Sequence, residues 1–197
     1  MSTRGLVGIR TNGYDHGFYN HCDSYPDGLG VEVVNFVRGK LKPEFRQTFL
    51  TNFQNIQVIE DSHGSPTEEN FLYYQGILGN EIGGGLGFDR AKTDWYALLR
   101  SYQGVGCLEA ILDGTLKHRV ESIEFIKDSL FCEYAYILNF DDGALEFWKG
   151  FQEVADQFNR FGTASENGYF PCKVVGSVPF DQVSTQTMRS LFPHEED

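Results

Sequence analysis

The chain has 197 residues, of which 41% are hydrophobic, so it is long enough to bury a sizeable core without disulfides or structural metals. Its 28 acidic and 16 basic residues give a formal charge of −12 at pH 7. This balance argues against binding to nucleic acid or to an anionic membrane surface, because both need clustered lysines and arginines. We therefore expect the partner to be a small molecule or a basic protein surface.

The four cysteines are widely spaced and form no CxxC pair, so their pattern indicates neither a zinc finger nor a redox motif. No apolar run follows the N-terminus, and none reaches the length of a membrane span. We therefore expect free thiols, no signal peptide and a cytoplasmic location. The sequence identifies no cofactor.

The first predicted element is a β-hairpin. Residues 5–10 and 17–23 read as two strands, and Asn12-Gly13 between them suits the positive φ angles of a tight turn. We expect the hairpin to bring Arg4 close to His21 or Asp23.

On the returning strand, residues two apart share one face, so His21 and Asp23 are predicted to lie side by side. Cys22 is expected to point the other way, into the core. Pro26-Asp27-Gly28 then breaks the strand.

Helices are predicted between this hairpin and a second one. Apolar residues at helical spacing and capping residues place them at residues 29–41, from Pro43 to Ile56, after an N-cap at Ser65, after Asp94, and at residues 107–112. Residues 120–126 fit a helix and a strand equally. The glycine-rich residues 79–87 lack the Gly-Lys-Ser/Thr of a phosphate loop, so we interpret them as a surface loop that could act as a lid.

The second predicted hairpin has the strongest strand of the chain, residues 131–140. An Asp141-Asp142-Gly143 turn and a return at residues 144–150 complete it. A last strand at residues 172–178 and a short helix capped by Asp181 follow. The pattern predicts an α+β fold with a mostly antiparallel sheet of about five strands, built from two hairpins and covered by helices. We expect a single domain over residues 1–197, with a helical insertion at about residues 42–118.

Two stretches of the sequence resemble a known family. One is Thr3-Arg4-Gly5-Leu6 together with the His-x-Asp-x-Tyr-Pro-x-Gly turn from His21 to Gly28, and the other is residues 133–138. In these segments, about a quarter of its length, the chain resembles a family of uncharacterised proteins found in bacteriophages, bacteria and filamentous fungi. The family has no assigned function, so the resemblance implies no reaction. It draws attention to Thr3, Arg4, His21, Asp23, Tyr25, Pro26 and Gly28.

Read chemically, Thr3, Arg4, His21, Asp23 and Tyr25 form a candidate catalytic or anion-binding corner. If Arg4 lies across from Asp23, its guanidinium can make a bidentate pair with that carboxylate, and Asp23 can hold or raise the pKa of His21. The alternative is that the Arg–Asp pair and the turn only fix the corner. A metal site would need His21, Asp23 and one distant carboxylate or histidine. Ser2 as an N-terminal nucleophile is a further alternative.

Two functions follow from this pattern. The first is a small molecule or nucleotide site at the corner, in a hydrolase or a simple binding protein. The second is an acidic protein-interaction module or inhibitor, phage- or host-associated, without catalysis. Clustering of Glu133, His63 or His118 within a few ångströms of His21 would favour the first, whereas an exposed, aromatic-rimmed acidic patch with no pocket beside His21 would favour the second.

Overall fold

The computed structural model describes residues 3–60 and 63–192 of the chain, so the suggestion for Ser2 lies outside the described residues. The fold is α+β, as predicted. Its main sheet has five strands in the order β2-β1-β5-β6-β7, and every neighbouring pair is antiparallel except β1 and β5. The strands are β1 (Gly5–Thr11), β2 (Tyr14–Asn20), β5 (Tyr134–Asn139), β6 (Ala144–Lys149) and β7 (Lys173–Pro179).

Both predicted hairpins are confirmed. In the first, Asn12 and Gly13 have φ angles of 54° and 81°, which is the backbone of a type I′ turn. In the second, β5 pairs with β6, and Gly143 has a φ of 67° in the connecting turn. The hairpins join edge to edge through β1 and β5.

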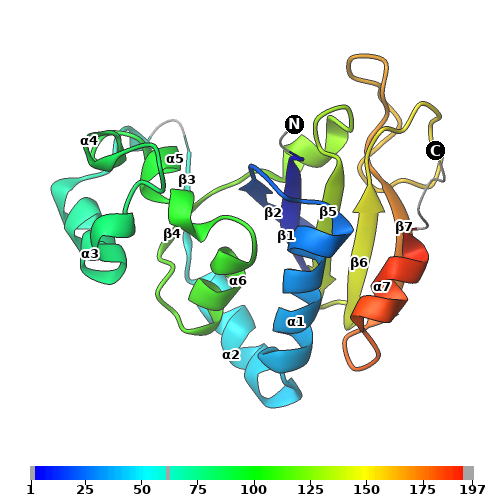
Figure 1. Cartoon of the computed structure of the whole chain (residues 1–197), viewed down its shortest axis with the longest axis horizontal. Helices are drawn as coiled ribbons and strands as arrows, with labels where there is room; N and C mark the ends of the chain where they lie inside the picture. The colour runs from blue at the N-terminus through cyan, green and yellow to red at the C-terminus, as the bar shows by residue number, and fades with distance from the viewer. Residues whose placement is uncertain (1–2, 61–62, 193–197) are drawn as a thin grey trace.

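Helices and short turns follow the first hairpin. They are the irregular turn η1 (Pro26–Gly30), α1 (Val31–Gly39), α2 (Pro43–Gln54), α3 (Glu68–Leu78), η3 (Gly79–Glu81), α4 (Phe88–Ala91), α5 (Trp95–Leu98), η4 (Arg100–Tyr102), α6 (Val105–Leu112), η5 (Ile123–Lys127) and α7 (Thr185–Leu191). Figure 1 shows α1 and α7 beside the sheet and α3, α4 and α5 gathered at the end of the molecule opposite β7. A two-stranded parallel sheet of β3 (Gln57–Ile59) and β4 (His118–Val120) links this end to the rest.

Two helix starts differ from the prediction. The N-cap of α3 is Thr67 rather than Ser65, because the Thr67 hydroxyl accepts from the Asn70 amide while the Asn70 side chain accepts from the Thr67 amide. The same reciprocal pair between Ser184 and Thr187 begins α7, where Asp181 was expected. In both helices the residue at N3 is Asn or Thr rather than the Glu or Gln of the usual signature.

The sheet separates two hydrophobic clusters. Period-two alternation sends Val7 and Tyr136 to the face covered by α1, and Leu6 and Ile137 to the opposite face, which residues of η5 help to cover. The larger cluster also contains Tyr74 and other residues of the segment that we expected as an insertion, and the single domain stays a prediction. Within the described residues, no helix has the length and apolar character needed to cross a bilayer.

Candidate functional site

The corner after β2 is fixed by hydrogen bonds around two buried residues. The side-chain amide of Asn20 donates to the Cys22 carbonyl at 2.5 Å and to the Ser24 hydroxyl at 2.8 Å. The Ser24 amide donates to the Thr3 carbonyl at 3.1 Å, and the Ser24 carbonyl accepts from the Tyr136 hydroxyl at 2.9 Å. Thr3 therefore contributes to the corner through its backbone.

Asp23 and Tyr25 also act through their backbones. Asp23 has a φ of 55°, and its carbonyl accepts from the Leu29 amide at 2.9 Å. The Tyr25 carbonyl accepts from the Gly28 amide at 3.0 Å. A Cβ at Gly28 would lie 2.4 Å from the Asp23 carbonyl oxygen, so only glycine fits without a shift.

Two details of the predicted corner are wrong, and the conditional Arg4–Asp23 pair does not form in the described structure. Strand β2 ends at Asn20, because the Asn20 side chain bonds the following backbone, so His21 and Asp23 do not share a strand face. For the same reason Cys22 is exposed and does not enter the core. Across the described parts of the chain, no ion pair joins Arg4 to Asp23.

The structure does bring Arg4 and His21 together. Gly5 pairs with Asn20 at the end of the β1–β2 ladder, which places the next two residues, Arg4 and His21, beside each other. The Arg4 amide donates to a Glu133 carboxylate oxygen at 3.3 Å, and the Arg4 guanidinium lies 5.4 Å from the Phe131 ring centroid. The charged group of Arg4 is thus held beside the corner.

Arg4 and His21 open onto a cavity of about 620 Å³, which we call the groove. Tyr19, on β2, is its central aromatic residue. The Tyr19 ring lies 5.1 Å from the ring of Phe125 and 6.2 Å from that of Tyr96, and its hydroxyl is 3.1 Å from His21 Nδ1. The groove therefore has aromatic walls and a histidine–arginine end.

A second arginine, Arg100 on η4, does not line the groove but contacts the groove residue Tyr96. Arg100 donates to the Tyr96 hydroxyl and, at 2.8 Å, to Gln103 Oε1, and its guanidinium lies 5.3 Å from the Tyr96 ring centroid. Partial burial and the charges of Arg100 and Arg4 lower the pKa of His21, so its imidazole is neutral at pH 7. Among the residues that the structure describes, no carboxylate lies within ion-pair distance of either guanidinium.

The two carboxylates of the groove are already paired. Glu124 contacts Lys127 at 2.6 Å. Glu121 contacts Arg119 and His16 and accepts the Gly17 amide at 2.6 Å. Burial alone would raise the pKa of Glu121, but the hydrogen bond with His16 and the charge of Arg119 lower it to about 2. Because these negative charges are compensated, the charge of Arg4 is left without a carboxylate partner in the groove.

Sequence reasoning found Arg4 and His21 but missed the rest of the groove. Tyr19 lies two residues before His21 and could have been noticed, whereas nothing in the sequence links Tyr96 or Arg100 to the corner. No three His, Cys, Asp or Glu side chains of the described residues cluster in a way that could hold a metal ion. The glycine-rich residues 79–87 line a different cavity, so the lid suggestion stays a prediction.

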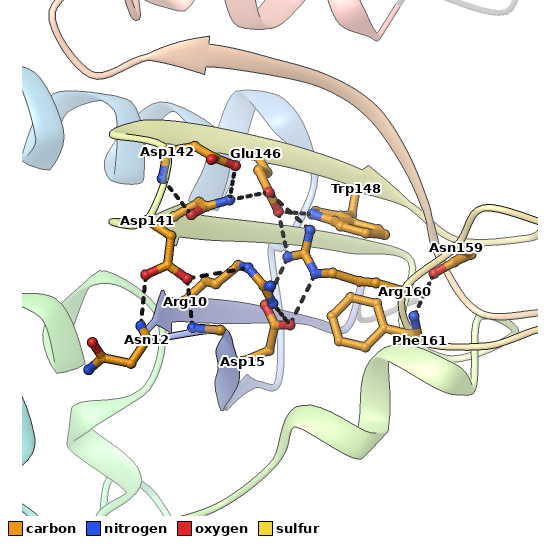
Figure 2. A network of polar contacts seen from close by, with 12 residues as sticks. Arg10, Asn12, Asp15, Asp141, Asp142, Glu146, Trp148, Asn159, Arg160 and Phe161 are labelled. Atoms are coloured by element: carbon orange, nitrogen blue, oxygen red, sulfur yellow. Dashed lines mark hydrogen bonds and ion pairs between the residues drawn. The ribbon is translucent and has the colours of Figure 1, made fainter.

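A second polar cluster lies at the turn end of the sheet, on strands β1, β2 and β6 (Figure 2). Its centre is Arg160, which makes bidentate contacts with Asp15 at 2.8 and 3.0 Å and with Glu146 at 2.6 and 3.0 Å. Arg10 also contacts Asp15, at 2.5 Å. Glu146 is 5% exposed and accepts from the Trp148 indole at 3.0 Å.

Every charged group of this cluster faces an opposite charge or a hydrogen-bond donor. Asp141, for example, accepts from the backbone amides of Asn12 and Gly13 at 2.7 and 2.8 Å. Arg160 belongs to the irregular segment of residues 150–172, so the cluster attaches that segment to the sheet. A saturated network of this kind is structural, and the groove remains the stronger candidate for function.

Comparison of the chain with protein family models, with curated proteins and with solved structures found no match in any of the three.

Proposed function

We propose that the groove binds a small anionic molecule that carries a planar group, and that a nucleotide is the class of ligand that best meets these requirements. The observation that carries this proposal is that Arg4 and His21 line the groove together, while Arg100 contacts the Tyr96 hydroxyl in its wall, and neither arginine has a carboxylate partner among the described residues. Guanidinium groups bind phosphate and carboxylate through paired N–H donors.

The aromatic walls support the planar part of the proposed ligand. Tyr96 is 37% exposed and carries Arg100 above its ring, so its outer face and edge offer a stacking surface next to a positive charge. A phosphate held by the arginines and a ring held against tyrosine would use both features of the groove. The local positive charge of the arginines would let the groove hold an anion even though the whole chain carries a formal charge of −12.

A hydrolytic reaction is compatible with the same residues. A neutral His21 can take a proton from the attacking water as its oxygen bonds to phosphorus, and can return that proton to the sugar oxygen when the phosphorus–oxygen bond to the sugar breaks, while Arg4 stabilises the negative charge on the phosphoryl oxygens. Release of inorganic phosphate from nucleotides by wild type but not by His21→Ala would establish that reaction. Binding without release would make the protein a simple binder.

The test of binding compares thermal unfolding with and without nucleoside 5′-monophosphates for wild type, Arg4→Met, Arg100→Met and Arg38→Met. Methionine keeps the side-chain stem and removes the charge, and Arg38 is an exposed arginine on α1 that serves as the matched control. A ligand at one hundred times its Kd adds about 2.7 kcal/mol to the free energy of unfolding. At roughly 2–4 °C per kcal/mol this raises Tm by about 5–11 °C.

We expect that rise in wild type and Arg38→Met, and a much smaller rise in the two groove variants. An equal rise in all four proteins would place the ligand outside the groove. No rise in any of them, with inorganic phosphate and ribose 5-phosphate included, would refute an anion site.

The acidic interaction module is the second candidate, and one observation favours it. Phe151, Val154 and Phe158 are 48, 79 and 97% exposed on the segment of residues 150–172, with the acidic Glu153 and Asp156 between them. We expect Phe158→Ser to leave thermal unfolding unchanged and to abolish salt-sensitive binding to a basic protein if this surface is the interface. Retained binding in Phe158→Ser would exclude this surface.

A further inference from the structure

The segment of residues 150–172 forms a loop whose two ends meet at Cys132, and we call this meeting point the neck. At one end of the loop, a Cβ added to Gly150 would lie 2.2 Å from the Cys132 carbonyl oxygen. At the other end, the Cys172 thiol donates to the same carbonyl oxygen at 3.1 Å. Cys132 therefore touches both ends of the loop.

Two thiols lie together in the neck. Cys132 and Cys172 are both fully buried, in the hydrophobic cluster that also contains Trp148. The Cys172 thiol is within hydrogen-bonding reach of the Cys132 thiol as well as of the Cys132 carbonyl. Burial and the neighbouring thiol raise the pKa of Cys132, so in the closed protein this residue stays a thiol and is unreactive at neutral pH.

The loop itself helps to cover the two thiols. The side-chain amide of Asn159 donates to the Cys172 carbonyl at 2.8 Å, and Phe161 packs against the cluster that contains both cysteines. Arg160, between these two residues, holds the same stretch on the sheet. None of residues 151–170 is buried, so local opening of the loop costs less than unfolding of the sheet. Such opening would expose the thiols.

We propose that Cys132 and Cys172 are a reversible oxidation site, at which a small disulfide of the oxidised glutathione type converts the two thiols into a disulfide that closes the neck. In the open loop, one cysteine thiolate attacks a sulfur of oxidised glutathione, breaks its S–S bond and releases one glutathione thiolate. The second cysteine thiolate attacks the protein sulfur of this mixed disulfide, forms the Cys132–Cys172 bond and releases the second glutathione thiolate. The two cysteine protons end on the two released glutathione molecules, which also receive the two electrons that the protein loses.

The disulfide would restrict a surface that the loop presents. Phe151, Val154 and Phe158 are exposed on this loop. When the neck is joined covalently, the end of the loop at Cys172 can no longer leave the sheet. Oxidation would then hold these apolar side chains in one arrangement, whereas reduction would let the loop open. This inference does not depend on the proposed anion site.

The experiment incubates the purified full-length protein with oxidised glutathione and maps its disulfides by mass spectrometry of unreduced tryptic peptides. The proteins are wild type, Cys172→Ala, Cys107→Ala and Arg160→Met. Cys107 is the matched control, because it is also fully buried but its thiol donates to the Gly104 carbonyl at 3.1 Å. Cys22 is exposed, so glutathione bound to it shows in every protein that the oxidant is active.

We expect a peptide pair linked through Cys132 and Cys172 in wild type and in Cys107→Ala, and none in Cys172→Ala. The link should form at least about tenfold faster in Arg160→Met, because loss of the Arg160 contacts raises the population of the open loop. Oxidised wild type should have a Tm about 4–16 °C above that of the reduced protein. Its residues 151–170 should also exchange amide hydrogens more slowly, and dithiothreitol should reverse both changes.

The peptide map of wild type decides whether the bond forms, so this result does not depend on the folding of Cys172→Ala. Wild type that carries glutathione on Cys22 but has no linked Cys132–Cys172 peptides would overturn the inference. A lower Tm in the oxidised protein would show that the bond distorts the neck instead of closing it, and would also overturn the inference. Equal rates of oxidation in wild type and Arg160→Met would refute opening of the loop as the route to the thiols.

Discussion

Replacement of Arg160 by methionine tests whether the polar cluster of Figure 2 holds residues 150–172 on the sheet. Methionine keeps an apolar stem against Trp148 and Phe161, whose ring centroids lie 4.7 and 5.1 Å from the guanidinium carbon. The substitution therefore removes mainly the charge and its four contacts with Asp15 and Glu146.

The expected loss follows from the burial of the two carboxylates. The side chains of Asp15 and Glu146 are 11 and 7% exposed, and breaking a buried ion pair costs about 3–5 kcal/mol. Arg10 still contacts Asp15, and Asn139 and Trp148 still donate to Glu146, so we expect the lower end, about 3 kcal/mol. At roughly 2–4 °C per kcal/mol, Tm should fall by about 6–12 °C.

The assay is urea unfolding, with Arg189→Met as the control. Arg189 contacts Asp27 at 2.8 Å, but both side chains are more than half exposed, so its loss should cost less than about 1 kcal/mol. Hydrogen exchange should show faster exchange in residues 150–172 of Arg160→Met. Equal stabilities of the two variants, with no change in exchange, would refute a structural role for the cluster.

Three further outcomes are expected. The pKa of Glu121 is lowered from 4.5 to about 2, so its ionised form stabilises the fold above pH 4.5, and this contribution, about 3 kcal/mol, is lost as pH falls towards 2. Urea unfolding across that pH range should show a free energy of unfolding that falls less with acid for Glu121→Gln than for wild type. Identical slopes of this free energy against pH in the two proteins would contradict the lowered pKa of Glu121. Gly28→Ala should lose about 1–3 kcal/mol in the same assay, because its Cβ would meet the Asp23 carbonyl oxygen at 2.4 Å. Gly39 lies at the end of α1, and a Cβ added there would have nothing within 4 Å. Gly39→Ala should therefore raise the free energy of unfolding by about 0.4–1 kcal/mol, and a decrease would show that free space around the new Cβ does not determine the stability change.

Local sequence signals were sufficient for the hairpins. Asn12-Gly13 specifies a type I′ turn, and alternating apolar residues specify the faces of the strands beside it. The same signals failed after Asn20, because a side chain that bonds its own backbone ended the strand and changed the direction of Cys22. The class of fold is therefore readable from short-range chemistry, while the end of an element depends on single hydrogen bonds.

The groove could be predicted only at one end. The hairpin register joins Arg4 to His21, and that contact is local in the sheet. The packing of α5 and η4 places Tyr96 and Arg100 beside the groove, and no sequence pattern near His21 predicts that packing. Arg160 likewise lies in a segment without regular structure, so its contacts with Asp15 and Glu146 depend on the path of residues 150–172.

The most direct test of the groove is the pKa of His21, measured by NMR titration of its ring protons. Burial, Arg100 and Arg4 all lower this pKa below its ordinary value of 6.5. Removal of a positive charge or arrival of an anion favours the protonated ring, so Arg4→Met, Arg100→Met or bound uridine 5′-monophosphate should each raise it. A pKa that stays at 6.5 in wild type, in both variants and with the nucleotide would contradict the proposed anion site.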